Sequence, residues 1–545
     1  MILDGPTVRV RQLSEVLGTD AQRLAGVQAI ESRLRPIRRA LYPTNVEISG
    51  EEAYAYLTRI VAEINEVLRQ HAGHYTWHRW LWYLRRVPDR VFQFKTMNTP
   101  DYDRAVAETV AGAFGSSTSS MPDAYPIEET SVRRVLRFCG MCLHLSDAFG
   151  ALQWAGAGAR FRFTDRALPD PVPSELDEAI RLYISRLSSE FPMFARLGIV
   201  TSLMPPTQGD ALVAPLFREK EPRVVNLRDV RFPFDETVEA NYHPIFVSIN
   251  DVLEFLKDAA LADAQFSPSI AALFLVQRVV LTLAFADQTY AAQMLVLGVC
   301  QSPLDTFMMA ADYVCANWSS FLSGLPLVIS VPQNGKELIN ALAGVNAVLQ
   351  PLKTGPLLAV ADHRVLIDVA AASQRMYAEL EAPTGAGRVA NFRSRYFELA
   401  VQGLIDRSPS APADRYRDLR GRTLRRNGRA ITDVDAIAER PDHLLLISCK
   451  SIPFSGRYDA GDYAAVRNAA SLITDEVNKH AAVVRALNES PSGDNYHFAK
   501  PLLPVVCIPH TLLLPIGPAT AEMLQNLRAV ASTSELVSWC QEAGA

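Results

Sequence analysis

Two aspartates and a lysine in the last quarter of the chain have the types and spacing that phosphodiester chemistry requires. Asp433 and Asp435 lie two residues apart in a β-branched, apolar run, and Lys450 follows a nearly continuous aliphatic run over 444–447. Carboxylates bind Mg²⁺ together with water and phosphate oxygens, and a lysine can orient a water or neutralise charge that develops on a phosphate. A metal and a lysine acting on a phosphodiester would perform hydrolytic strand cleavage.

These residues are predicted to lie on a β-hairpin with a turn at 439–442. Because side chains alternate along a strand, Asp433 and Asp435 share one face of a first strand over 431–438. Ser448 and Lys450 likewise share one face of the second strand. A salt-bridged hairpin at a sheet edge, where lysine prevents aggregation, gives the same pattern. The hairpin alone does not distinguish these two interpretations.

A predicted helix upstream supplies another carboxylate. Apolar residues recur at helical spacing over 391–405 and define one face of that helix. Glu398 lies beside this face, so it could reach a neighbouring sheet. Taken singly, a glutamate that flanks an amphipathic helix is more often an ordinary surface residue.

The order of helix-Glu, strand-Asp and strand-Lys resembles the restriction-endonuclease-like, or PD-(D/E)xK, nuclease superfamily. Phe397-Glu398 matches the helix motif, 434–437 matches the first strand and 444–450 matches the second strand. The resemblance covers about the last third of the chain. It implies an α/β C-terminal domain, with a mixed central sheet flanked by helices, that follows a mainly α-helical N-terminal region.

The same resemblance implies a catalytic site and its cofactor. The site would consist of a glutamate, two aspartates, a serine and a lysine: Glu398, Asp433, Asp435, Ser448 and Lys450. Mg²⁺ or Mn²⁺ would be held by Glu398, Asp435 and the backbone carbonyl of Cys449. Lys450 would position the attacking water, and Asp433 would assist.

Ser448 departs from the family pattern, which usually has Glu or Gln at this place. A serine hydroxyl carries no charge and is a weak Mg²⁺ ligand, so three outcomes stay open. Glu398 and Asp435 hold the metal with backbone and water oxygens, because two carboxylates are a normal number for Mg²⁺. Alternatively, the missing acid has moved to Asp475 or Glu476 on a predicted helix over 463–487, as in some Ser-x-Lys restriction enzymes. In the third outcome the domain is inactive and only binds.

Arginines gather between the predicted helix and the hairpin, opposed only by Asp414 and Asp418. They are Arg415, Arg417, Arg420, Arg422, Arg425, Arg426 and Arg429. The guanidinium fork binds two phosphate oxygens at once, and several such contacts give a strongly salt-dependent affinity for nucleic acid. The alternative is a solvated charged loop.

The composition limits the class of protein. The chain has 545 residues, a net charge of −5, 49% hydrophobic and 21% charged residues, which is typical of a soluble protein with several domains. Because the whole chain is mildly acidic, any affinity for nucleic acid must be local. Seven cysteines, an odd number, indicate reduced thiols rather than a disulfide scaffold.

We expect three domains: a helical one over 1–120, a mainly helical middle region with some β-structure over 121–385, and the nuclease-like domain over 386–545. Helical spacing predicts helices over 51–71, 131–152, 174–187 and 252–262, and 357–372 and 505–508 read as strands. The loop over 381–387 is the expected boundary of the last domain.

The N-terminus lacks a basic region followed by an apolar core, and the most apolar stretch, 270–286, is interrupted by Gln277 and Arg278. We therefore expect a buried helix there, a cytoplasmic location and no membrane partner. The expected partner is nucleic acid, DNA rather than RNA, together with a homodimer or an activating protein. Family analogy suggests restriction or anti-phage defence. The alternative function is a degenerate nuclease-fold module that binds nucleic acid or scaffolds a complex.

Overall fold

The computed structural model describes residues 4–92, 100–116, 120–122, 124–173, 175–189, 268–318, 331–343, 346–349, 352–372, 375, 388–452, 458 and 461–542. Within these residues the protein is mixed α/β, with a mainly helical N-terminal region and several small sheets. The expected helix over 252–262 and the expected boundary loop over 381–387 lie outside the described residues.

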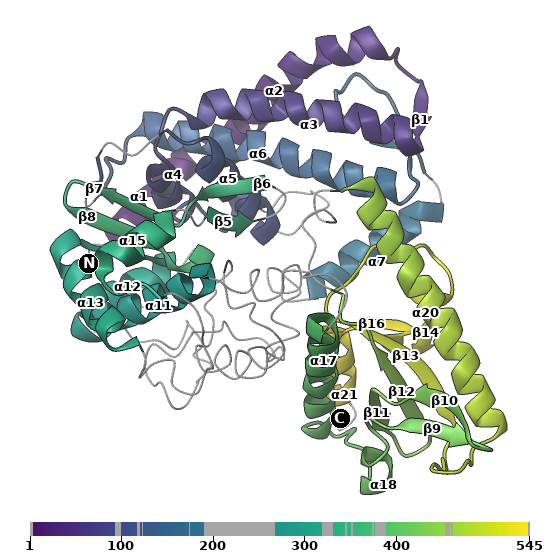
Figure 1. Cartoon of the computed structure of the whole chain (residues 1–545). Coiled ribbons are helices and arrows are strands. Elements are labelled where there is room, and N and C mark those ends of the chain that lie inside the picture. The colour runs from purple at the N-terminus through teal and green to yellow at the C-terminus, as the bar shows by residue number, and fades with distance from the viewer. Residues whose placement is uncertain are drawn as a thin grey trace.

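Helices dominate the N-terminal region. They are α1 (Asp4–Val16), α2 (Thr19–Leu41), α3 (Gly50–Ala72), α4 (Trp77–Leu84), η1 (Asp89–Val91), α5 (Pro100–Phe114), α6 (Glu129–Gly156) and α7 (Glu175–Ser189), with a small sheet of β1 (Glu47–Ser49), β2 (Arg160–Arg162) and β3 (Asp170–Pro171). The helices predicted over 51–71, 131–152 and 174–187 are confirmed as α3, α6 and α7. Figure 1 shows α2, α3 and α6 side by side.

Helices α2 and α6 approach each other closely through two glycines. A Cβ atom added to Gly26 would lie 2.1 Å from the carbonyl oxygen of Arg137, and one added to Gly140 would lie 2.1 Å from that of Arg23. One hydrophobic core runs from Val10 to Tyr183 and continues across residue 120, where the sequence suggested a boundary. The helices on either side of that position therefore share one core.

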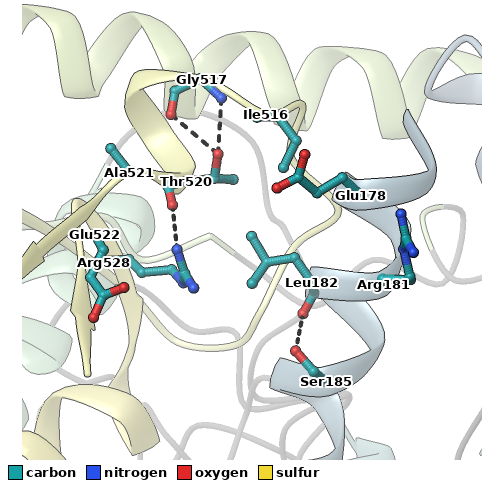
Figure 2. A pocket seen from close by; sticks show the side chains of 10 residues that line it. All are labelled: Glu178, Arg181, Leu182, Ser185, Ile516, Gly517, Thr520, Ala521, Glu522 and Arg528. Carbon is teal, nitrogen blue, oxygen red and sulfur yellow. Dashed lines mark hydrogen bonds between the residues drawn. The ribbon is translucent and has the colours of Figure 1, made fainter. Parts of the chain in front are cut away.

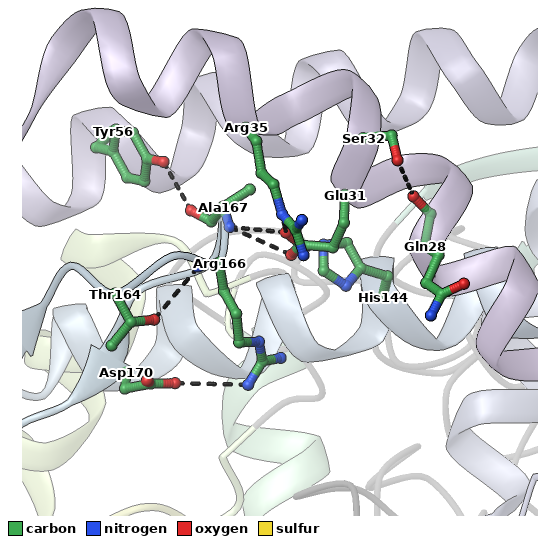
Figure 3. A network of polar contacts seen from close by, with 10 residues as sticks. All are labelled: Gln28, Glu31, Ser32, Arg35, Tyr56, His144, Thr164, Arg166, Ala167 and Asp170. Atoms are coloured by element: carbon green, nitrogen blue, oxygen red, sulfur yellow. Dashed lines mark hydrogen bonds and ion pairs between the residues drawn. The ribbon is translucent and has the colours of Figure 1, made fainter. Parts of the chain in front are cut away.

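A buried glutamate joins α2 to the loop that follows β2 (Figure 3). The Glu31 carboxylate accepts a hydrogen bond from the backbone N–H of Ala167 at 2.9 Å, and His144 Nε2 on α6 lies 3.4 Å from it. Burial lowers the pKa of His144 to about 4, so the imidazole is neutral at pH 7. Tyr56 on α3 donates to the carbonyl oxygen of the same Ala167 at 2.7 Å. The loop is thus bonded to α2 and α3, and α6 lies against the same glutamate.

The middle region contains helices and two small sheets. Its elements are α11 (Pro268–Ala286), α12 (Gln288–Leu297), β4 (Val299–Pro303), α13 (Leu304–Ala316), α15 (Gly335–Ala343), β5 (Asn346–Leu349), β6 (Leu352–Pro356), β7 (Leu358–Ala361) and β8 (Arg364–Asp368). The strands predicted within 357–372 are confirmed as β7 and β8, which pair with β4 in the order β4-β8-β7. The most apolar stretch is a largely buried helix, α11, as expected.

Among the described helices, α6 alone is long and apolar enough to cross a membrane by length and composition, and 89% of its most apolar window is buried inside the protein. This helix packs against α2 and α3 in the core.

The terminal domain is built on a four-stranded sheet in the order β11-β12-β13-β16. Its elements are α17 (Arg388–Asp406), α18 (Asp414–Arg417), β9 (Thr423–Arg426), β10 (Arg429–Asp433), β11 (Ala436–Glu439), β12 (Leu444–Cys449), α20 (Tyr463–Glu489), β13 (Leu502–Ile508), η2 (Pro518–Thr520), β14 (Glu522–Leu524), β15 (Leu527–Arg528), β16 (Val530–Ser532) and α21 (Thr533–Gln541). Strands β11 and β12 are antiparallel, whereas β12–β13 and β13–β16 are parallel.

Helices cover both faces of this sheet (Figure 1). Helices α17 and α21 pack on one face, where Phe397 and Trp539 join the core around Ile447. Helix α20 covers the other face, where Val484 packs near Leu446. Every residue of β12 is buried, which explains its nearly continuous aliphatic sequence. The α20 helix and the β13 strand confirm the elements expected over 463–487 and 505–508.

The terminal domain contacts the N-terminal helices at α6 and α7. Arg186 on α7 is buried and donates from Nε and Nη2 to the two carboxylate oxygens of Glu535, both at 2.7 Å, and from Nη2 to the carbonyl oxygen of Val530 at 3.0 Å. Gln153 on α6 donates to the carbonyl oxygen of Tyr458 at 3.2 Å. Polar contacts therefore hold the sheet domain against the helical region at two places.

Candidate active site

The expected single strand over 431–438 is wrong. Strand β10 ends at Asp433 and β11 begins at Ala436, with Val434 and Asp435 between them. The break arises because β10 pairs with β9 rather than with β12. At the break, Val434 is buried in the core, and its backbone exchanges hydrogen bonds with Gly421 and Arg422 ahead of β9. The two aspartates therefore lie on different sides of a chain bend rather than on one strand face.

Asp435 is held at this bend by the end of β12. Its Oδ2 accepts a hydrogen bond from the backbone N–H of Cys449 at 2.8 Å and lies 3.5 Å from the Ser448 hydroxyl. The contact with Cys449 uses the N–H, rather than the carbonyl that the resemblance assigned to a metal. The side-chain amide of Gln402 donates to the backbone carbonyl of Asp435. These contacts orient the carboxylate before any ligand binds.

Ser448 and Lys450 contact the same oxygen of Glu476. The Ser448 hydroxyl donates to Glu476 Oε1 at 3.1 Å, and Lys450 Nζ lies 3.0 Å from that atom. The expectation that Ser448 and Lys450 share one face is thus confirmed. Of the two candidate acids on α20, Glu476 reaches the lysine, whereas Asp475 is exposed. A carboxylate from the helix therefore lies next to Ser448, at the place where the resemblance would lead one to expect an acid.

Sequence reasoning missed two residues that position this group. Gln402 lies four residues after Glu398 on α17, and His480 lies four residues after Glu476 on α20; that spacing puts each pair on one helix face. His480 Nε2 donates to the carbonyl oxygen of Leu446 in β12 at 2.8 Å, and burial lowers the pKa of this histidine. Their i, i+4 spacing from Glu398 and Glu476 was the feature of the sequence that could have identified these two residues.

Like charges surround Glu398. Burial, followed by the nearby charge of Asp435, raises the pKa of Glu398 to about 7, although Lys450 acts in the opposite direction. Burial also raises the pKa of Asp435, and the hydrogen bond from Cys449 opposes this rise. Burial opposes the ionisation of Glu476, but the hydrogen bonds from Lys450 and Ser448 outweigh it and lower the pKa of Glu476. Lys450 is thus paired with an ionised carboxylate, whereas Glu398 and Asp435 repel each other.

The donor set around Glu398 and Asp435 fits a hard cation. Asp435 raises the pKa of Glu398, and burial raises the pKa of both groups, so a positive charge beside them is favourable. Carboxylate oxygens suit Mg²⁺, which otherwise keeps several waters. Within the described residues, no group of three or more His, Cys, Asp or Glu side chains converges on one point. The site therefore fits an ion that two protein carboxylates hold, with water and substrate as its remaining ligands. Asp433 is exposed and accepts a hydrogen bond from Thr423.

We expect Mg²⁺ affinity to rise with pH up to about 7, because only ionised Glu398 binds the ion. Below the raised pKa of about 7, each unit by which the pH falls should weaken Mg²⁺ binding by about tenfold. Without metal, the stability of the fold should fall as pH rises from 4.5 to about 7. The reason is that the folded protein keeps a proton on Glu398 that the unfolded chain releases above 4.5. Calorimetric Mg²⁺ titrations across this range test the expectation. Glu398→Gln should bind weakly and with a shallower pH dependence, which comes from Asp435 alone. An equally steep pH dependence in that variant would contradict the assignment.

The seven arginines divide into two groups. Arg417 and Arg420 form ion pairs with Asp406 at 3.5 and 3.0 Å, and Arg415 stacks over the ring of Tyr416 with its guanidinium carbon 4.6 Å from the centroid. The other four lie on or next to the β9–β10 hairpin and make no ion pair with any described residue: Arg422, Arg425, Arg426 and Arg429. The second group therefore has no described counter-charge that an external anion would have to displace.

A cavity of about 560 Å³ lies between α7 and the segment 516–528 of the terminal domain (Figure 2). Its lining includes Arg181 and Glu178 from α7, and Arg528 and Glu522 from the β14–β15 hairpin. None of the acids around Lys450 lines it. The cavity is therefore separate from the carboxylate–lysine cluster.

A scan against protein-family models finds no match, and neither the curated proteins nor the solved structures yield a similar chain. The cytoplasmic location, the domain boundaries and the resident metal stay predictions.

All seven cysteines are buried and form no disulfide, which agrees with the expected free thiols.

Proposed function

We propose that this protein is a metal-dependent nuclease that hydrolyses phosphodiester bonds in nucleic acid, with DNA as the polymer. The observation that carries the proposal is that the charges of Glu398 and Asp435 both interact with that of Lys450, whose ammonium pairs with Glu476 at 3.0 Å. A helix, a strand bend, a strand end and a second helix contribute these four residues. The sheet order and the helices on both faces also support the resemblance to the restriction-endonuclease-like superfamily.

Each residue has a distinct proposed role. Glu398 and Asp435 would hold Mg²⁺ or Mn²⁺, which when bound would polarise the phosphate and lower the pKa of a water. Lys450 would orient the attacking water and neutralise charge that develops on the phosphate oxygens. Glu476 would position Lys450 through their 3.0 Å ion pair. Ser448 would hold Glu476 in place by the hydrogen bond to the same oxygen.

A role in restriction or anti-phage defence is proposed from the resemblance alone. The large helical region, tied to the terminal domain at Arg186 and Gln153, would then recognise a target or restrain cleavage.

A second candidate is a binding module without catalysis. Ser448 in place of an acid, and the engagement of Glu476 with Lys450, favour this candidate because they leave two carboxylates for a metal. The two candidates differ in one requirement: catalysis needs the metal, whereas binding through arginines does not.

The test is cleavage of single- and double-stranded DNA and RNA with Mg²⁺, Mn²⁺ or EDTA, by the native protein and by Asp435→Asn. We expect cleavage that EDTA abolishes and that Asp435→Asn reduces by at least about tenfold, with weaker Mg²⁺ binding in a calorimetric titration. Asp475→Asn is the matched control, because Asp475 is exposed on α20. Cleavage that continues in EDTA, or equal Mg²⁺ affinity in Asp435→Asn, would contradict the proposal.

A further inference from the structure

We infer that the β9–β10 hairpin binds the phosphate backbone of a nucleic-acid duplex, which makes the substrate double-stranded. This inference rests on the proposed nuclease function and goes beyond it, because it assigns the form of the substrate and the element that binds it.

The register of the hairpin places two like charges opposite each other. Arg426 on β9 pairs directly with Arg429 on β10, and Arg425 pairs with Ala430. Like charges that face each other across a ladder destabilise a hairpin. Within the described residues, no carboxylate lies within ion-pair distance of either arginine. A bound phosphate between the two guanidinium groups would remove this repulsion, and arginine binds phosphate oxygens in pairs.

The hairpin is held rigid by the loop that follows α20. The Asp494 carboxylate accepts hydrogen bonds from the turn amides of Asn427 and Gly428, at 3.0 and 2.8 Å. Asn495 accepts from the backbone N–H of Arg425 at 2.9 Å and donates to the carbonyl oxygen of Thr423 at 2.9 Å. Asn427 and Gly428 have φ of 51° and 75°, the conformation that a two-residue type I′ turn requires. The arginines therefore project from a fixed platform and lose little backbone freedom on binding.

The base of the hairpin lies at the proposed active site. Strand β10 ends at Asp433, whose carboxylate accepts a hydrogen bond from Thr423 on β9, and Asp435 follows after one residue. At about 3.3 Å of rise per residue, Arg429 lies about 13 Å along the strand from Asp433, which corresponds to about four steps of a DNA strand. A backbone that contacts the arginines is thus within a few nucleotides of Asp435. Figure 1 shows the hairpin beside β11.

The aromatic side chains of this domain favour a duplex over a single strand. Proteins that bind single strands stack the bases on exposed aromatic rings. Tyr416, Tyr496 and Phe498 are buried in the core that Leu424 of β9 joins, so the aromatic rings packed against the hairpin point inward. Arginines that project above buried rings suit the regular phosphate backbone of a duplex, which presents no bases to stack.

The test is equilibrium binding in EDTA by the full chain carrying Lys450→Ala, so that neither metal nor cleavage contributes. The probes are a labelled DNA duplex of about two helical turns, one of its single strands, and an RNA duplex of the same sequence. The hairpin variant adds Arg426→Gln and Arg429→Gln. Its matched control adds Arg160→Gln and Arg162→Gln, two half-exposed arginines on β2 that pair with Glu47. Thermal melting checks that each variant is folded.

We expect the DNA duplex to bind more tightly than the single strand. The hairpin variant should lower the slope of log affinity against log salt by about two, at about 0.9 for each lost phosphate contact, while the control leaves it unchanged. Equal hairpin-dependent binding of the RNA duplex would support the duplex inference and would show that the hairpin binds the backbone of an RNA duplex as well. Tighter binding of the single strand, or equal slopes in the hairpin variant and its control, would overturn the inference.

The outcomes separate this inference from the proposed function. If the native protein cleaves with Mg²⁺ while the hairpin variant binds as the control does, the hairpin inference fails and the nuclease stands. If duplex binding depends on the hairpin but no metal supports cleavage, the nuclease proposal fails and the hairpin inference stands.

Discussion

Replacing Lys450 with alanine should lower the rate of metal-dependent cleavage by about 10²- to 10⁴-fold, the range that a positioned acid–base group contributes. Lys450 Nζ lies 3.0 Å from Glu476 Oε1, and its charge also acts on Glu398 and Asp435, so its loss removes a positive charge from the site. Single-turnover cleavage at saturating Mg²⁺ measures the effect on the chemical step.

The matched control is Lys479→Ala, which removes an exposed lysine from the same helix, three residues after Glu476. The control should cleave at nearly the native rate. A second readout separates chemistry from positioning: the affinity of the Lys450→Ala protein for a DNA duplex should stay within a few-fold of native, because the hairpin arginines are unchanged. Cleavage by Lys450→Ala at the rate of the control would remove this lysine from the mechanism.

Arg85→Ala should destabilise the protein by about 3–5 kcal/mol, the usual cost of removing one partner from a buried ion pair. Arg85 Nη2 lies 3.0 Å from Glu108 on α5 and 2.7 Å from Asp368 on β8, and Nη1 donates to the carbonyl oxygen of Leu297 at 2.8 Å. All three charged side chains are buried. Alanine would leave two carboxylates without a counter-charge between the N-terminal helices and the middle sheet.

The free energy of unfolding, measured by urea denaturation, tests this expectation. Arg69→Ala is the control, because Arg69 forms an exposed pair with Glu66 that should contribute at most about 1 kcal/mol. Adding Glu108→Gln and Asp368→Asn to Arg85→Ala should restore part of the loss, since neutral amides need no counter-charge. A loss for Arg85→Ala no larger than that of Arg69→Ala would contradict the role assigned to this ion pair.

Local patterns predicted the elements of the terminal domain well. The apolar periodicity over 391–405 and 463–487 corresponds to α17 and α20, and the aliphatic run before Lys450 is the buried strand β12. These predictions succeeded because burial of one helix face, or of both faces of a strand, leaves a repeating pattern in the residues themselves. The break at Val434 was missed because β-branched residues suit a strand on either side of a bend.

The sequence by itself determined which residue types could do chemistry here and the helices and strands that carry them. It identified Glu398, Asp435 and Lys450 as candidates, and it left the choice between Asp475 and Glu476 open. Only the tertiary structure showed that Glu476, and not Asp475, contacts Lys450 and Ser448, because neighbouring residues point about 100° apart around a helix and the packing of the terminal domain turns one of them inward. The same packing separated the paired arginines from those on the hairpin, since ion pairs such as Arg420 with Asp406 join residues from different elements. Contacts between elements distant in sequence leave no local pattern, and for that reason only the folded chain shows them.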